Sequence, residues 1–154
     1  MRNIRYALVI CMGLLAAAPV FAATNQAFNA ALTALRTKNF DQALLDFRAL
    51  ANSGHGGAAF MLGVMHEQGL GVAVDPKLAA VAYLRAAKLG DASAQYNLAV
   101  FHQLGKGVAR SDAAALKWHA AAAAQGHPKA QNNLGAIYFT GAGVARDLVE
   151  AWKW

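Results

Sequence analysis

Charged residues, prolines and cysteines are all scarce in this sequence of 154 residues. Only 14% of the residues are charged while 57% are apolar, a balance that excludes a disordered polymer and predicts a packed core. Three prolines beside an abundance of alanine favour closely packed helices over a β protein rich in turns. We therefore expect an all-α fold.

The single cysteine, Cys11, lies in an N-terminal segment that has the pattern of an export signal. Arg2 and Arg5 precede an apolar stretch that ends in small residues at Ala22. We predict that residues 1–22 are a signal peptide, cleaved after Ala22. The apolar stretch is shorter than the roughly 20 residues of a spanning helix, so we expect no stable membrane anchor after cleavage. The remaining chain would be periplasmic or secreted, and it would fold without disulfides.

The charges that remain are spread along the chain. Residues 23–154 carry 12 Lys and Arg against 8 Asp and Glu, with no basic cluster. This distribution is typical of a solvated surface and does not indicate a nucleic-acid partner.

A spacing of 36 residues recurs through the sequence. It links the segments Gly69–Val72, Gly105–Val108 and Gly141–Val144, which share the pattern GxGV. Four further columns keep the same step: Ala58, Ala94 and Ala130; Leu62, Leu98 and Leu134; Gly54, Gly90 and Gly126; Ala79, Ala115 and Ala151. Matching columns at one period are the mark of a repeat protein.

Each repeat has the pattern of two helices. Ala58, Leu62 and Met65 fall on one face of the first helix, which we expect to be buried. Gly69 stands where a helix C-terminus favours a left-handed residue, and Gly71 allows a tight turn, so GxGV is predicted to join the two helices. The expected N-caps of the second helices are Asp75, Ser111 and Asp147, and Glu150 would complete a capping box with Asp147.

These patterns divide the chain into a signal peptide, a cap and three repeats. Residues 23–53 are predicted to form a degenerate N-terminal capping helix pair, with helices over about 26–37 and 41–52. The repeats follow at 54–89, 90–125 and 126–154, and the last is incomplete. Its final helix, with Trp152 and Trp154, would leave apolar surface exposed. Either the sequence is a piece of a longer repeat protein, or this surface pairs with another copy or with a partner.

The repeat columns resemble the Sel-one-like repeat, a relative of the tetratricopeptide repeat, over nearly all of residues 54–154. The fullest matches are Ala94 to Leu98 with Gly105–Val108 and Trp118, and Ala130 to Gly135 with Tyr138 and Gly141–Asp147. The resemblance implies a right-handed α-solenoid of antiparallel helix pairs, whose first helices line a concave surface that receives a partner. It implies no reaction, no cofactor and no metal.

Candidate binding residues are taken from the exposed side of each first helix. Aromatic side chains beside amides suit the recognition of an extended peptide. The candidates are Phe60, Met61, Val64, Gln68, Tyr96, Asn97, Val100, Asn132 and Asn133. Contact with the adjacent helix is the alternative role for them. We assign Trp118 to the core, because it recurs in a packing column.

No catalytic motif is complete in the sequence. Leu70 stands where an HExxH motif that begins at His66 would need its second histidine. We therefore expect an exported adaptor that binds a protein or peptide partner and is not an enzyme. Two alternatives stay open: a cell-envelope hydrolase acting on peptidoglycan or β-lactams, and a factor that binds polysaccharide during envelope assembly.

Overall fold

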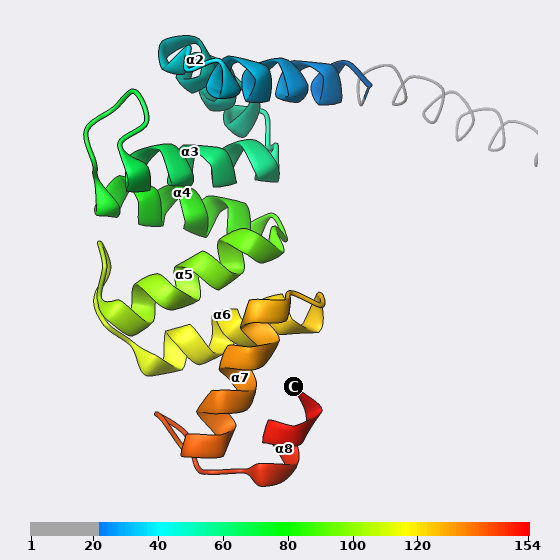
Figure 1. Cartoon of the computed structure of the whole chain (residues 1–154), viewed down its shortest axis with the longest axis vertical. Coiled ribbons are helices and arrows are strands. Elements are labelled where there is room, and N and C mark those ends of the chain that lie inside the picture. Colours follow the sequence, from blue (N-terminus) through cyan, green and yellow to red (C-terminus); the bar gives the residue numbers. More distant parts are fainter. Residues whose placement is uncertain (1–21) are drawn as a thin grey trace, which may run out of the picture.

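A computed structural model describes residues 22–154 as a stack of helices, each followed by the next along one long axis (Figure 1). The predicted signal peptide lies outside this described part, except for Ala22. Residues 22–36 are helical. The helices that follow are α2 (Phe40–Asn52), α3 (Gly56–Gln68), α4 (Pro76–Lys88), α5 (Ala92–Leu104), α6 (Asp112–Ala124), α7 (Pro128–Thr140) and α8 (Leu148–Lys153). No strand occurs between residues 22 and 154, which confirms the all-α prediction.

The helices form pairs that stack through their sequence neighbours. Within the pairs, α3 packs on α4, α5 on α6, and α7 on α8; between pairs, α2 packs on α3, α4 on α5, and α6 on α7. Figure 1 shows the GxGV turns along the left-hand edge and the turns between pairs along the right-hand edge. This arrangement is an α-solenoid of helix pairs, as predicted.

The second helices begin at the three predicted N-caps. An Asp75 carboxylate oxygen accepts hydrogen bonds from the backbone N–H groups of the first turn of α4, at 2.9 and 3.0 Å. Ser111 and Asp147 do the same for α6 and α8. These bonds satisfy donors that a helix start would otherwise leave unpaired.

The predicted capping box at α8 is only half formed. Asp147 accepts from the backbone of Glu150, but the Glu150 side chain pairs with Lys153 one turn further along. The N–H group of Asp147 instead donates to the Tyr138 carbonyl oxygen at 3.0 Å, so a backbone acceptor on α7 replaces the expected carboxylate. The prediction of a reciprocal box was therefore wrong.

The second glycine of each GxGV turn fixes how one pair sits on the pair before it. Gly107 has a φ of 69°, in the left-handed region, and a Cβ atom there would overlap the carbonyl oxygen of Pro76 at the start of α4. A Cβ atom at Gly71 would overlap the Cβ atom of Phe40 at the start of α2, and one at Gly143 would overlap the Cβ atom of Asp112 at the start of α6. Backbone can come this close only where no side chain intervenes.

The core is built from small side chains around a few large ones. The largest fully buried side chains include Tyr83, Phe47, Phe101 and Met65. Alanines such as Ala58 surround them, which lets neighbouring helices approach closely. The principal cluster runs from residues 22–36 to α5, and a smaller one joins α6 to α7. Trp118 packs against the principal cluster, in agreement with its assignment to the core.

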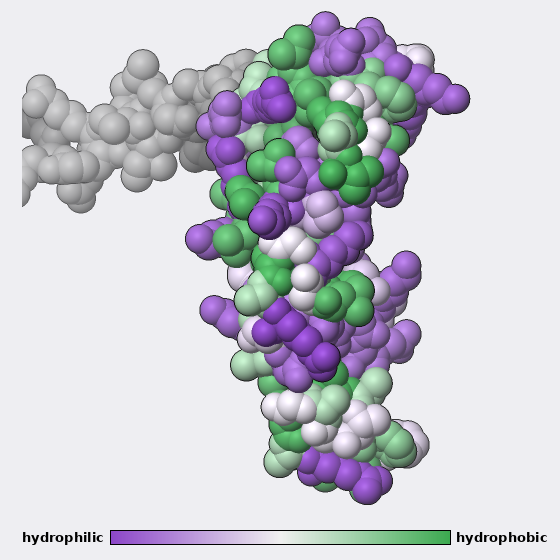
Figure 2. Space-filling view, turned by 90° about the vertical axis from the view of Figure 1, so that its left-hand side faces the viewer, coloured by the Kyte–Doolittle hydropathy of each residue, from purple (hydrophilic) through white to green (hydrophobic). Residues whose placement is uncertain are grey.

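The edge that carries the GxGV turns shows no continuous apolar band; hydrophobic and hydrophilic residues alternate over it (Figure 2). None of the helices between residues 22 and 154 combines the length and the apolar character that crossing a membrane requires.

Candidate functional site

The nine predicted binding residues all lie on the first helices of the three pairs. Four belong to α3, three to α5 and two to α7. We call these nine positions the first-helix strip. Gln68 and Asn132 are exposed, whereas the other seven are half-buried. Half-buried positions can touch a partner only with part of their surface, so their contacts within the chain matter.

On α3 the strip contributes to packing more than predicted. Met61 and Val64 pack against the principal core cluster, although we placed them opposite the buried face. The reason is that α3 lies between α2 and α4 and is covered from two sides. The Phe60 ring lies 5.7 Å from the Tyr83 ring, measured between centroids, and is also part of this packing.

On α5 the strip has one aromatic anchor, and an exposed apolar side chain lies beside it. Tyr96 stacks on His127, with ring centroids 4.8 Å apart and planes inclined by 18°. His127 is itself held as the N-cap of α7, where its Nδ1 accepts from the Ala130 N–H group at 3.3 Å. One turn beyond Val100, Leu104 is 71% exposed. A large apolar side chain of that exposure can contact a partner.

On α7 the most exposed aromatic residue was not among the nine candidates. Phe139 is 57% exposed, and the Arg146 guanidinium lies 5.4 Å from its ring centroid. Its repeat column holds Glu67 and Gln103, which are polar, so the column gave no signal for an aromatic site.

A polar junction that includes Asn97 of the strip joins three helices. The Tyr83 hydroxyl on α4 donates to Glu67 Oε2 on α3 at 2.5 Å, and the Asn97 side chain on α5 also interacts with this hydroxyl. Lys106 Nζ donates to Glu67 Oε1 at 2.8 Å and lies 5.0 Å from the Phe101 ring centroid. Burial, together with the hydrogen bond to Glu67, raises the pKa of Tyr83 above its ordinary range. We call this group the Tyr83 junction.

The same positions one repeat later form the His119 junction. His119 Nε2 on α6 lies 3.2 Å from Gln103 Oε1 on α5 and 3.5 Å from Asn133 Nδ2 on α7. The imidazole is fully buried, and burial, with a smaller contribution from His127, lowers the pKa of His119 to about 4. Within the described chain, its Nδ1 has no hydrogen-bond partner. The sequence patterns did not indicate either junction.

Neither junction has the arrangement of a catalytic centre. A general base needs a pKa near the working pH, whereas the Tyr83 hydroxyl is shifted upward and His119 downward, and His119 faces amides. His66 and His102 share a repeat column. Burial lowers the pKa of His66, and His102 Nδ1 lies 3.3 Å from the Ala109 carbonyl oxygen. Among residues 22–154, no group of three His, Cys, Asp or Glu side chains is placed to hold a metal ion.

Known structures resemble this chain at the level of fold and sequence. A Sel1 repeat protein from Oxalobacter formigenes superposes with a TM-score of 0.78 at 30% identity, over 81% of this chain and 51% of that one. A protective antigen of uropathogenic Escherichia coli strains that displays an SLR fold gives a TM-score of 0.70 at 40% identity, over 73% of this chain and 24% of that one. This chain thus spans about half and about a quarter of their lengths. Helicobacter pylori cysteine rich protein B shares the fold, with a TM-score of 0.58 at 20% identity over 70% of this chain and 92% of that one.

Comparison with curated proteins gives no significant match. A model of the Sel1 repeat, in contrast, matches three consecutive segments: residues 57–91, 92–127 and 128–154. These segments cover the helix pairs α3–α4, α5–α6 and α7–α8, apart from Gly56 at the start of α3. Sel1 repeats generally mediate protein–protein interactions. The chain belongs to the Sel1 repeat family.

Proposed function

We propose that this protein is an exported adaptor that binds a protein or peptide segment along the first-helix strip and the residues beside it. The observation that carries this proposal is the alignment of equivalent positions on α3, α5 and α7, which places Gln68, Leu104 and Thr140 in one exposed column. A row of exposed side chains at a regular spacing suits an extended partner that contacts several repeats at once.

The chemistry of the strip favours a partner segment with apolar side chains. Leu104 and Phe139 offer exposed apolar contacts, while Gln68 and Asn132 are exposed amides that can both donate and accept hydrogen bonds. No member of the nine-residue strip carries a formal charge. An acidic or basic peptide would therefore gain little from the strip itself.

A displayed library of random peptides tests the proposal. Peptides selected by the purified chain are synthesised and titrated against the wild type and two variants by calorimetry. Leu104→Glu should weaken binding about tenfold or more, because it places a charge directly beside the strip, one turn beyond Val100. Val81→Glu is the matched control, since Val81 is similarly exposed but lies on the second helix α4. Selected peptides that bind both variants equally well would show that the strip is not the binding surface.

The export part of the proposal concerns residues 1–22. The arginines and the apolar stretch before Ala22 support it. Fractionation of cells that express the full chain should find it in the periplasm or the medium, and mass spectrometry should find an N-terminus at Ala23. A chain that stays in the cytoplasm with its N-terminus intact would refute export without affecting the binding proposal.

We further propose that the last repeat supports self-association. Helix α8 exposes Leu148, Val149 and Trp152, and Leu148 and Trp152 are four residues apart, so they share one face of the helix. Apolar surface of this kind favours association. Light scattering over a range of concentrations tests this, and a wild type that is monomeric at every concentration would refute it.

A further inference from the structure

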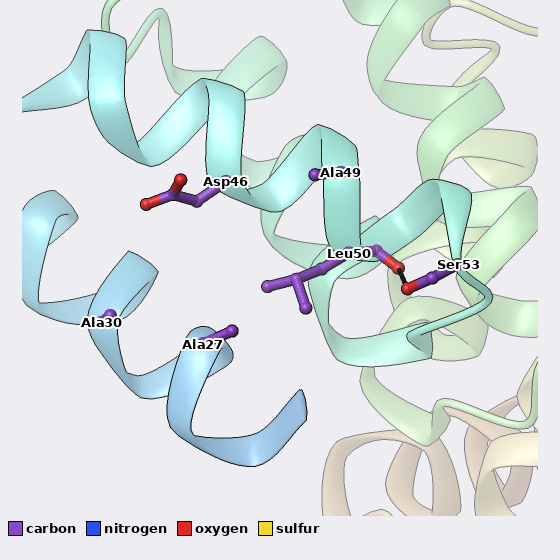
Figure 3. A pocket seen from close by; sticks show the side chains of 6 residues that line it. All are labelled: Ala27, Ala30, Asp46, Ala49, Leu50 and Ser53. Atoms are coloured by element: carbon purple, nitrogen blue, oxygen red, sulfur yellow. Dashed lines mark hydrogen bonds between the residues drawn. The ribbon is translucent and has the colours of Figure 1, made fainter. Parts of the chain in front are cut away.

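A cavity in a repeat protein can be compared with the same place one repeat away. The cleft drawn in Figure 3 lies between residues 22–36 and α2, has no earlier helix pair in the described chain for comparison, and is lined by Ala27, Ala30, Asp46, Ala49, Leu50 and Ser53. A pocket of about 350 Å³, in contrast, lies within the stack, where the first helix and the turn of the pair α7–α8 meet the pair α5–α6. Its walls include Gln103, Asp112, Ile137 and Ala142, and we call it the interpair pocket.

One repeat earlier, a lysine side chain fills the corresponding space. Lys106 stands in the GxGV turn of the pair α5–α6, with its ammonium nitrogen 2.8 Å from Glu67 Oε1 and 5.0 Å from the Phe101 ring centroid. The side chain is 39% exposed. In this arrangement a lysine covers apolar surface with its methylene groups while a carboxylate and water hold its charge.

The three positions one repeat after these residues all line the interpair pocket. Ala142 replaces the lysine, Gln103 replaces the carboxylate and Ile137 replaces the ring. The backbone does not account for the pocket, because Gly143 lies against the start of α6 as Gly107 lies against the start of α4. The interpair pocket is therefore the space that a lysine side chain occupies in the preceding repeat.

The pocket offers hydrogen-bond acceptors to an ammonium group. Asp112 brings a carboxylate to its wall, on the first turn of α6, where the preceding repeat has Pro76. Gln103 Oε1 lies 3.2 Å from His119 Nε2, and an amide oxygen has two lone pairs, so it can accept a second hydrogen bond. Arg110 is the competing cation, with its Nε 3.5 Å from Asp112 Oδ1. Its side chain is 71% exposed, so solvent weakens this ion pair.

We propose that the interpair pocket binds a lysine side chain of the partner segment, with the ammonium group between Asp112 and Gln103 and the methylene groups against Ile137. Gln103 directly precedes Leu104 on α5, so a segment that contacts the first-helix strip and Leu104 passes close to the pocket. The strip is uncharged, and the pocket supplies the charged contact. The source of the lysine rests on the function proposed above, whereas the pocket itself does not.

Lysine blocked at both ends, N-acetyl-lysine N-methylamide, tests the pocket without a partner. In a titration followed by heteronuclear NMR it should shift the backbone amide signals of Ala142 and Gly143, with a dissociation constant of about 1 mM, as expected for a ligand of this size. Blocked norleucine has the same carbon chain without the ammonium group and should bind about tenfold more weakly. Equal binding of the two compounds, or no binding of blocked lysine, would overturn the proposal.

A lysine introduced into the turn tests where the blocked lysine binds. Ala142→Lys should rebuild the arrangement of Lys106 and abolish binding, because the new side chain fills the pocket. Ala142 is exposed, so the fold should be retained by circular dichroism. Ala145→Lys is the matched control, since it adds the same charge at an exposed position of the same turn, away from the residues that line the pocket. Equal loss of binding in both variants would overturn the proposal, because added charge alone would then explain it.

Two further variants test the sign of the charge that the pocket prefers. Asp112→Asn should weaken the binding of blocked lysine about fivefold, because it removes the carboxylate. Arg110→Ala should strengthen binding about twofold, because it removes the competing cation. Preferential binding of blocked glutamate, lost in Arg110→Ala, would make the pocket an anion site and overturn the proposal.

The peptides selected for the first-helix strip test the source of the lysine. They should carry a lysine and lose about tenfold in affinity for Ala142→Lys, with no loss for Ala145→Lys. Selected peptides that bind Ala142→Lys as tightly as the wild type would overturn the assignment of the lysine to the partner segment. A library that yields no binding peptide would instead contradict the proposed function, and the binding of blocked lysine to the pocket would be unaffected.

Discussion

The Tyr83 junction and the His119 junction occupy the same positions in successive repeats, but their buried polar atoms are hydrogen-bonded in different ways. At the first, a phenol donates to Glu67, and Lys106 from the following turn binds the other carboxylate oxygen. At the second, an imidazole meets Gln103 with one nitrogen and leaves the other without a hydrogen-bond partner in the described chain. The repeat therefore fixes where three helices meet, while the residue types decide how well the buried polar atoms are satisfied.

The largest effect is expected from Tyr83→Ala. Tyr83 is the largest fully buried side chain, and its ring contacts Phe60 and Phe101 at centroid distances of 5.7 and 5.3 Å. Its removal should lower the free energy of unfolding by about 3 to 5 kcal/mol, measured by urea denaturation. The Glu67 carboxylate would also lose a donor.

His119→Ala is the matched change at the second junction. It removes a smaller side chain whose Nδ1 is unpaired, and should therefore cost less than Tyr83→Ala. Equal losses from the two alanine variants would contradict the view that the Tyr83 junction is the better satisfied one.

The pH dependence of the free energy of unfolding should also distinguish the two junctions. Because burial lowers the pKa of His119 to about 4 in the folded chain, the unfolded chain takes up a proton there first as the pH falls. The contribution of neutral His119 to the free energy of unfolding is thus fully present above about pH 6.5. It declines progressively down to about pH 4, by about 2 to 3 kcal/mol. The raised pKa of Tyr83 has no such effect in this range.

Urea denaturation at pH 7 and at pH 4.5 measures this loss. His119→Gln should remove most of the difference between the two pH values, with a remainder because burial also lowers the pKa of His66. If His119→Gln loses as much stability on acidification as the wild type, His119 is not the group responsible.

The helical stack was predictable because its signals are local and occur three times. A 36-residue step, glycines in GxGV and capping residues such as Asp75 each act within a few residues of their own position. The junctions were not predictable in this way, because the Tyr83 hydroxyl meets residues 16 positions earlier and 14 positions later, and only the tertiary packing brings them together. The partial burial of Met61 against the core was missed for the same reason, since periodicity cannot show that α3 is covered from two sides.

Tyr83→Phe removes only the hydroxyl and should have a smaller effect. The ring contacts remain, but Glu67 Oε2 loses its donor in a partly buried site, which costs about 1 to 2 kcal/mol. Urea denaturation of this variant beside Tyr83→Ala separates the hydrogen bond from the packing. No loss would mean that water replaces the hydroxyl as the donor.

The smallest effect is expected from Lys106→Met, which removes the ion pair across two repeats and keeps the apolar part of the side chain. Lys106 and Glu67 side chains are 39% and 25% exposed, so solvent screens the pair, and we expect a loss of about 0.5 to 1 kcal/mol in urea denaturation. The loss should shrink in 1 M salt, where charges are screened within about 3 Å. Glu67→Gln and the double variant complete a double-mutant cycle, which measures the coupling free energy between Lys106 and Glu67. This coupling should vanish if the ammonium mainly contacts the Phe101 ring. A loss as large as that of Tyr83→Phe would show that the Tyr83 junction depends on its charges more than on its hydroxyl.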